Sequence, residues 1–175
     1  AAALAGVLGI FCSVMVYVAT GRAQWSATPT GLKFFGTALV LGSSSVLLVG
    51  LFSSPPSLGL DHIAEALLCV VLGATGVKLL LDLALLRKHK DRQLSIEKRM
   101  ARVMLGDLRA ITGLRLLLSL LGGLLLPALL LGSKLGGDPR VPVAAMVLLL
   151  LGGELAERAL FFRAAPASRM PGGLR

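Results

Sequence analysis

The sequence predicts an all-α fold, a polytopic bundle of transmembrane helices with five spans. Of its 175 residues, 55% are hydrophobic and only 15% are charged, whereas a soluble domain carries about 25% charged residues. The apolar residues form long uninterrupted runs, unlike the apolar stripe of a soluble amphipathic helix. These two observations exclude a soluble globular enzyme. They also exclude a disordered chain, because disordered segments are poor in apolar residues.

Each predicted span has about the 20 mostly apolar residues that a bilayer requires. The second span ends at a Ser-Ser-Pro-Pro turn, which cannot continue a helix, and the fifth begins near Pro139 and Pro142. The sequence opens inside an apolar run with no charged segment before it, so we expect a piece of a longer protein and not a signal peptide. The spans of this single domain, residues 1–175, are 1–19, 32–52, 63–86, 111–131 and 141–162.

Lys and Arg residues are distributed unequally between the two sides of the predicted bundle. Thirteen of the 18 fall on one side, namely Arg22, Lys33, eight in the loop 87–110 and three in the C-terminal tail. Only Lys134 and Arg140 fall on the other side. Because the basic side faces the cytoplasm, the loop and the C-terminus are predicted to be cytoplasmic. With one Trp and one Tyr in the chain, no row of rings exists to stack bases, and nucleic acid is not an expected partner.

The basic loop 87–110 itself contains a helical pattern. Apolar residues recur from Ile96 to Leu108 at helical spacing, with basic residues between them, and Ser95 precedes them as a candidate N-cap. The pattern predicts a short amphipathic helix lying at the membrane surface. The alternative is a docking face for a soluble partner.

Six charged residues fall inside the predicted spans, where a charge is costly without a partner. They are Lys78, Asp82, Arg115, Glu154, Glu157 and Arg158. Two pairs, Lys78 with Asp82 and Glu154 with Arg158, are four residues apart and therefore lie on one helix face. All six are expected in the cytoplasmic half of the membrane, as one polar cluster. The cluster either fixes helix register or carries protons, with Glu154 the best candidate because Arg158 cannot neutralise both glutamates.

Residues suited to metal, haem or nucleophilic chemistry are few. His62 and Glu65 stand at the start of the third span, and His89 lies in the basic loop. A haem between helices needs two axial ligands, usually His, so no haem is expected here. Cys12 and Cys69 form no CxxC motif, so no metal site and no catalytic residue is predicted. His62 either hydrogen-bonds a quinone carbonyl or is a solvated interfacial histidine.

Three stretches resemble the membrane anchor subunits of dimethyl sulfoxide reductase-type molybdenum oxidoreductases. The first runs from Gly9 to Thr37, with Tyr17, Arg22 and Trp25 in the matching positions. The second covers residues 105–115. The third begins with Gly-Glu at 153–154, continues through residue 162, and closes with Met-Pro-Gly-Gly at 170–173. Their order and spacing extend the resemblance over the whole chain.

This resemblance implies a function as well as a fold. Such anchors have eight spans, of which the five here correspond to the last five. They hold a molybdopterin catalytic subunit and an iron–sulfur electron-transfer subunit at the bacterial or archaeal cytoplasmic membrane, and exchange electrons with quinone or menaquinone in anaerobic respiration. The anchor itself is a non-catalytic, quinone-interacting subunit. Related polysulfide-reductase-type anchors bind quinone in their first four-helix bundle, of which this chain retains the last helix.

Two other functions fit the same sequence. In a transporter-like protein, the intramembrane charges would line a path for a solute or an ion. In a purely structural anchor, they would serve helix pairing alone. An inverted repeat would favour the transporter, and no obvious one is present. Co-purification with an iron–sulfur subunit would distinguish the quinone-reactive anchor from both alternatives.

The unequal basic charge generates a test of topology. In intact cells, a membrane-impermeant thiol reagent is expected to label a Ser57→Cys variant and to leave Ser95→Cys unlabelled, because Ser95 lies in the basic loop. Permeabilised cells serve as the control, in which both cysteines should react. Labelling of Ser95→Cys from outside with Ser57→Cys protected would reverse the predicted orientation.

Overall fold

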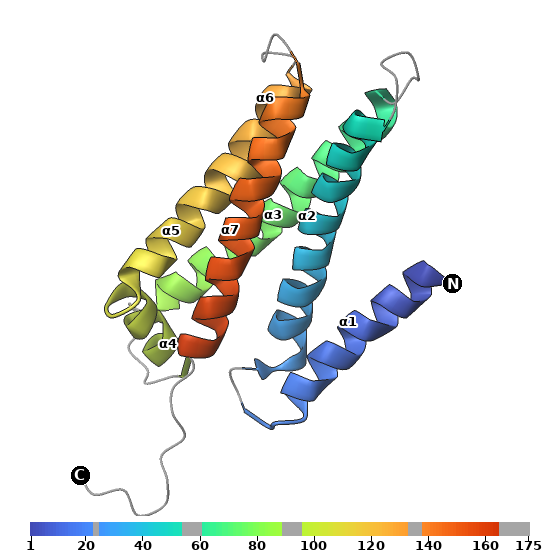
Figure 1. Cartoon of the computed structure of the whole chain (residues 1–175). Coiled ribbons are helices and arrows are strands. Elements are labelled where there is room, and N and C mark those ends of the chain that lie inside the picture. The colour runs from blue at the N-terminus through green and yellow to red at the C-terminus, as the bar shows by residue number, and fades with distance from the viewer. Residues whose placement is uncertain (23–24, 54–60, 89–95, 133–137, 165–175) are drawn as a thin grey trace, which may run out of the picture.

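A computed structural model describes residues 1–22, 25–53, 61–88, 96–132 and 138–164. All regular secondary structure within these ranges is helical (Figure 1). The elements are α1 (Ala2–Val18), α2 (Ala27–Ser53), α3 (Asp61–Arg87), α4 (Ile96–Leu105), α5 (Arg109–Leu120), the π-helical turn η3 (Leu121–Leu125), α6 (Leu126–Leu131) and α7 (Arg140–Arg163).

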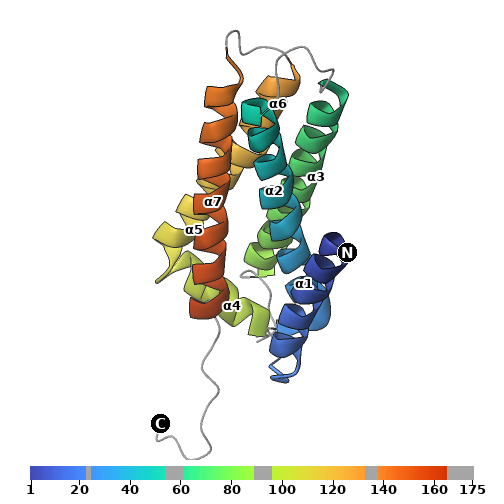
Figure 2. The same cartoon turned by 45° about the vertical axis from the view of Figure 1, so that its right-hand side comes forward.

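Four long helical segments lie side by side and reverse direction at each connection. They are α2, α3, the continuous run of α5, η3 and α6, and α7 (Figures 1 and 2). Helix α1 packs on the outside against α2. We call the end of the bundle that bears α4 and the C-terminus of α7 the basic end. The alternation of chain direction brings the start of α2, the end of α3, α4 and the C-terminus of α7 to this one end (Figures 1 and 2).

The number of membrane spans differs from the prediction of five. By length and composition, three helical segments can cross a membrane, namely Ala27–Ser53, His62–Arg87 and Arg109–Leu131. Helix α1 is apolar but has only 17 residues. Helix α7 is long enough at 24 residues, but its second half carries two glutamates and two arginines. Five spans are therefore not confirmed, because one expected span is short and another is too highly charged.

Apolar side chains cover much of the outside of the bundle. Val46, Leu80, Leu117 and Leu148 project from four different segments and are each more than half exposed. Charged and hydroxyl side chains are instead buried between the helices. This distribution is the reverse of that in a water-soluble bundle and suits helices surrounded by lipid, where small and polar residues mediate helix contacts.

The fourth predicted span is continuous through its glycines and proline. Pro127 has no N–H to donate to the carbonyl four residues earlier, and the helix widens just before it into the π turn η3. There Leu126 donates its N–H to the Leu121 carbonyl. Gly122 lies in the same turn, and a Cβ atom at this position would stand 2.8 Å from the Leu149 Cβ. The missing side chain therefore lets this segment approach α7 closely.

The predicted amphipathic helix of the basic loop is present as α4, whereas its candidate cap Ser95 lies outside the described residues. Met104 of α4 is buried against Leu160 and Ala164 at the end of α7. A larger apolar cluster, built around Val40, Val71, Met146 and Leu150, fills the opposite half of the bundle. The interior between these two clusters holds the buried charges. A surface position of α4 on the membrane stays a prediction.

Candidate functional site

Six ionised side chains from four helices form one connected structure, which we call the ion network. It consists of Lys33 from α2, Lys78 and Asp82 from α3, Arg115 from α5, and Glu154 and Glu157 from α7. Along the network, each cation is followed by an anion. The ion pairs connect these side chains in the order Lys33, Asp82, Arg115, Glu157, Lys78 and Glu154. This order begins on α2 and includes residues of every long segment of the bundle.

Lys78 is the most highly coordinated member of the ion network. Its Nζ donates to both carboxylate oxygens of Glu154, at 2.6 and 2.5 Å, and lies 2.8 Å from Glu157 Oε2. The aliphatic part of the side chain crosses α2 at Gly36, where an added Cβ would stand 2.9 Å from Lys78 Cδ. Gly36 therefore provides the space in which the lysine reaches α7. These are charge-assisted contacts, which are the stronger kind of hydrogen bond.

Arg115 joins the other half of the ion network. Its Nη2 donates to Glu157 Oε2 at 2.7 Å, and its Nη1 contacts Asp82 Oδ2. The second oxygen of Asp82 lies 3.4 Å from Lys33 Nζ. The guanidinium thus bridges α3 and α7 with its two terminal nitrogens, in the forked geometry that suits arginine to carboxylates.

The ion network is buried, and its charges balance. Five members, Lys78, Asp82, Arg115, Glu154 and Glu157, are at most 8% exposed, and the Lys33 side chain is 20% exposed. Three cations face three anions, so the group as a whole brings no net charge into the bundle. An unpaired charge in an apolar interior is strongly unfavourable, whereas a fully paired set is tolerated.

Thr37 links the ion network to Arg158. Its Oγ1 accepts from Lys78 Nζ at 3.1 Å and from Arg158 Nη2 at 3.2 Å. The same oxygen lies 2.6 Å from Glu154 Oε2 and 2.8 Å from the Lys33 carbonyl, but it has one hydrogen to donate. The carboxylate is the charged and nearer acceptor, so we assign the hydrogen to Glu154. Arg158 itself stays at the edge of the network, only partly buried.

The structure corrects the predicted pairing of these charges. The sequence places Lys78 with Asp82 and Glu154 with Arg158, each pair along one helix. Instead, Lys78 pairs with the two glutamates of α7, and Asp82 pairs with Arg115 and Lys33. Contacts between helices prevail because they neutralise buried carboxylates from several directions at once. The predicted single cluster is observed for five of the six charges, with Arg158 at its margin.

The sequence interpretation misses Lys33, a member of the ion network, and Thr37, which contacts it. The sequence pattern places Lys33 in the basic flank, because the second predicted span begins at residue 32. Helix α2 begins at Ala27, so Lys33 lies almost two turns inside it, with Thr37 one further turn along. The missed signal is the i, i+4 spacing of these polar residues on a helix whose neighbour carries Asp82.

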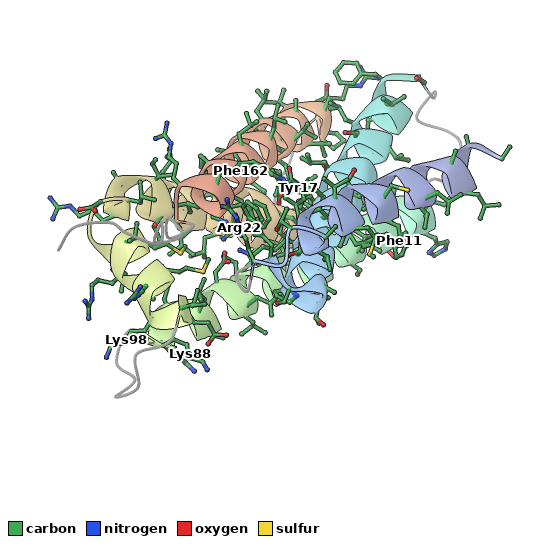
Figure 3. All side chains as sticks on the ribbon, turned by 90° about the horizontal axis from the view of Figure 1, so that it is seen from below. Phe11, Tyr17, Arg22, Lys88, Lys98 and Phe162 are labelled. Carbon is green, nitrogen blue, oxygen red and sulfur yellow. The ribbon has the colours of Figure 1, made fainter. Side chains whose placement is uncertain are left out.

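An aromatic cluster adjoins the ion network at the basic end. Tyr17 packs with ring-centroid distances of 5.4 Å to both Trp25 and Phe161 and 5.5 Å to Phe34. Arg22 lies 5.0 Å from the Trp25 ring, and Arg158 lies 3.8 Å from the Phe34 ring. Both arginines therefore make cation–π contacts with this cluster. Seen from the basic end, Tyr17, Arg22 and Phe162 gather together, while Lys88 and Lys98 project farther out (Figure 3).

The remaining predicted site residues lie apart from both groups. His62 and Glu65 stand at the opposite end of α3, with Nδ1 of His62 3.8 Å from Glu65 Oε2. Their side chains are 96% and 64% exposed. The structure therefore brings Tyr17, Arg22 and Trp25 close to the ion network but leaves His62 and Glu65 outside it. Among the described residues, no group of three or more His, Cys, Asp or Glu side chains is arranged to hold a metal ion.

Comparison with known proteins identifies one family. The family model described as DMSO reductase anchor subunit (DmsC) matches residues 1–163. The match covers α1 to α7, including every member of the ion network and of the aromatic cluster. No curated protein and no solved structure matches the chain.

Pairing in the ion network generates a prediction on stability. Lys78→Met removes the cation that neutralises Glu154 and is expected to lower the free energy of unfolding in mixed micelles by about 3–5 kcal/mol. The matched control is Lys88→Met, because Lys88 pairs with Glu97 through side chains that are about half exposed. This control is expected to change stability by less than about 1 kcal/mol. If the two substitutions lowered the free energy of unfolding equally, the buried ion pairs would contribute no more to stability than an exposed pair does.

Proposed function

Because the chain belongs to the DMSO reductase anchor subunit family, we propose that it exchanges electrons between the quinone or menaquinone pool and an oxidoreductase complex. The observation that carries this proposal is the family match over residues 1–163. In the proposed complex, the chain anchors an iron–sulfur electron-transfer subunit and a molybdopterin catalytic subunit at the bacterial or archaeal cytoplasmic membrane. Its C-terminus faces the cytoplasm in this proposal, and the subunit serves anaerobic respiration without catalysing the terminal reaction.

The sequence supports different roles for the subunits of such a complex. The chain offers a single histidine near a span, His62, and two isolated cysteines, so we expect the redox centres to belong to the partner subunits. Quinone is then a substrate that this chain positions. To do so, the chain needs an apolar slot, hydrogen-bond donors and a path for protons. The candidates for these roles include Tyr17 and Trp25 of the aromatic cluster and Arg22, which lies over the Trp25 ring.

For the ion network, we propose a structural role ahead of a proton path or a solute path. Its cations and anions are equal in number, and each carboxylate contacts at least one cation from another helix. A transport path would require access to water, whereas the five innermost residues of the network are at most 8% exposed. These observations favour a structural role, in which the network fixes the register of the helices, over the transporter-like alternative.

Two functional measurements test the anchor proposal. Expressed with its neighbouring genes, the tagged chain is expected to co-purify with an iron–sulfur subunit, and this complex in nanodiscs should oxidise a naphthoquinol. The chain purified alone should do neither and should show no haem absorbance, because the redox centres are supplied in trans. Quinol oxidation by the isolated chain, or solute uptake into vesicles that contain it alone, would contradict the proposal.

Glu154→Gln distinguishes a structural network from a proton path. Because the substitution leaves Lys78 short of one anion, it is expected to reduce the amount of assembled complex while turnover per complex stays near the wild-type value. The matched control is Glu97→Gln in the exposed pair with Lys88, which should affect neither quantity. Normal assembly with turnover reduced tenfold, equivalent to about 1.4 kcal/mol in the barrier, would establish the proton path instead.

A further inference from the structure

Helix α4 packs its apolar side against the rest of the bundle. Ala101 and Met104 are at most 4% exposed, and Met104 packs with Leu160 and Ala164 at the end of α7. An interfacial amphipathic helix instead buries its apolar face at the boundary of headgroups and acyl chains. The apolar side of α4 is occupied by protein, so a contact between this helix and the membrane has to involve its other side.

A cavity of about 540 Å³ adjoins the inner side of α4 at the basic end of the bundle. It is lined by the start of α2, the ends of α3 and α7, and α4, with Thr30, Lys33, Met104 and Phe161 among the lining residues. Met104 belongs both to the packed side of α4 and to the wall of this cavity. The two features therefore occupy the same side of the helix.

Two arginines lie on the opposite side of α4. Arg99 and Arg102 are both exposed, and at 3.6 residues per turn they share one helix face, turned away from Ala101 and Met104. Neighbouring like charges on a helix surface repel each other and destabilise the helix slightly. An anion bound by both arginines would offset this repulsion.

Three more exposed arginines stand at the ends of long helices at the basic end. Arg87 is the last residue of α3, Arg109 is the first of α5, and Arg163 is the last of α7. Arg87 and Arg109 are also the terminal residues of two segments that can cross a membrane. A spanning helix ends where the hydrocarbon core gives way to lipid headgroups, so these arginines lie at headgroup depth.

These five residues, which we call the arginine group, take no part in the ion pairs among the described residues. The cations of those pairs are Lys33, Lys78, Lys88, Arg115, Arg140 and, when protonated, His62. Glu97 of α4 is paired with Lys88, and the exposed Asp107 lies in the turn between α4 and α5. One such carboxylate cannot balance five guanidinium groups, so the arginine group has an excess of positive charge.

The chemistry and the depth of the arginine group indicate its partner. A guanidinium group binds phosphate through two parallel hydrogen bonds and is more weakly hydrated than an ammonium group. Basic residues just outside a membrane span attract the anionic lipids of the adjoining leaflet. A phosphate held in a lipid headgroup lies at the same depth as Arg87 and Arg109, whereas a free phosphate ion has no such restriction.

We propose that the arginine group is a binding surface for the phosphate groups of anionic phospholipids. In this arrangement, α4 contacts the bundle through its apolar side and the headgroups through Arg99 and Arg102. The helix is thereby held between protein and lipid without inserting into the hydrocarbon core. The inference goes beyond the proposed function and does not depend on quinone exchange.

The lipid preference of the full chain, reconstituted in phosphatidylcholine, tests the arginine group. Electron spin resonance is expected to show spin-labelled phosphatidylglycerol associating at least about tenfold more strongly than spin-labelled phosphatidylcholine, and Arg102→Gln should lower this preference about fivefold. The matched control is Arg140→Gln, which removes the same charge from an exposed arginine at the opposite end, where Arg140 already donates to the Leu51 carbonyl. The control should keep the wild-type preference.

A pair of double variants separates the forked contacts from charge alone. Arg99→Gln with Arg102→Gln should remove most of the preference, whereas Arg99→Lys with Arg102→Lys keeps both charges and should lower it about twofold to threefold. Both double variants should unfold at the wild-type temperature, because the replaced side chains lie on the exposed side of α4. Excess inorganic phosphate should leave the preference unchanged.

Three results would overturn the proposal. The first is an equal loss of preference in Arg102→Gln and Arg140→Gln, which would indicate a response to net charge. The second is an unchanged preference in the double glutamine variant. The third is full competition by inorganic phosphate, which would assign the arginine group to a soluble anion.

Discussion

Mutual neutralisation of buried charges is the constraint on which the bundle depends. Lys78 and Arg115 each contact two anions, and through them α3, α5 and α7 are held at one depth relative to one another. Sliding any of these helices by one turn would separate cations from anions by about 5 Å and leave charges unpaired in apolar surroundings. Apolar packing alone is non-directional, so it would tolerate several such registers. The ion network selects one.

The same constraint organises the basic end. Thr37 accepts a hydrogen bond from Arg158, and the Arg158 guanidinium lies over the Phe34 ring of the aromatic cluster. These two contacts connect the ion network to the cluster. Lys33 extends the network in another direction, to the wall of the cavity. Charges, rings and cavity thus form one continuous structure, although they come from segments more than a hundred residues apart. A change in one of these groups therefore bears directly on the position of the others.

Much of the helical architecture could be predicted from the sequence, because apolar runs and their basic flanks are local signals. Each long helix lies within a few residues of its predicted span, and five of the six intramembrane charges do meet. The partners of those charges could not be predicted, since Asp82 lies one turn from Lys78 on the same helix, yet Lys78 pairs with two carboxylates of α7. The cavity was equally hidden. Thr30 and Met104 line the same cavity only through tertiary packing, and no spacing in the chain relates them.

Helix α7 has a consequence for how this protein is made. It carries four charged residues in its second half and is not among the segments apolar enough to cross a membrane, so its transfer into lipid on its own is unfavourable. Its glutamates find their partners on α3 and α5, both of which leave the ribosome earlier. Lys78 and Arg115 are therefore synthesised before the glutamates of α7 that they neutralise. Incorporation of α7 is in this sense cooperative, because its buried carboxylates are neutralised only when it packs against these two earlier helices.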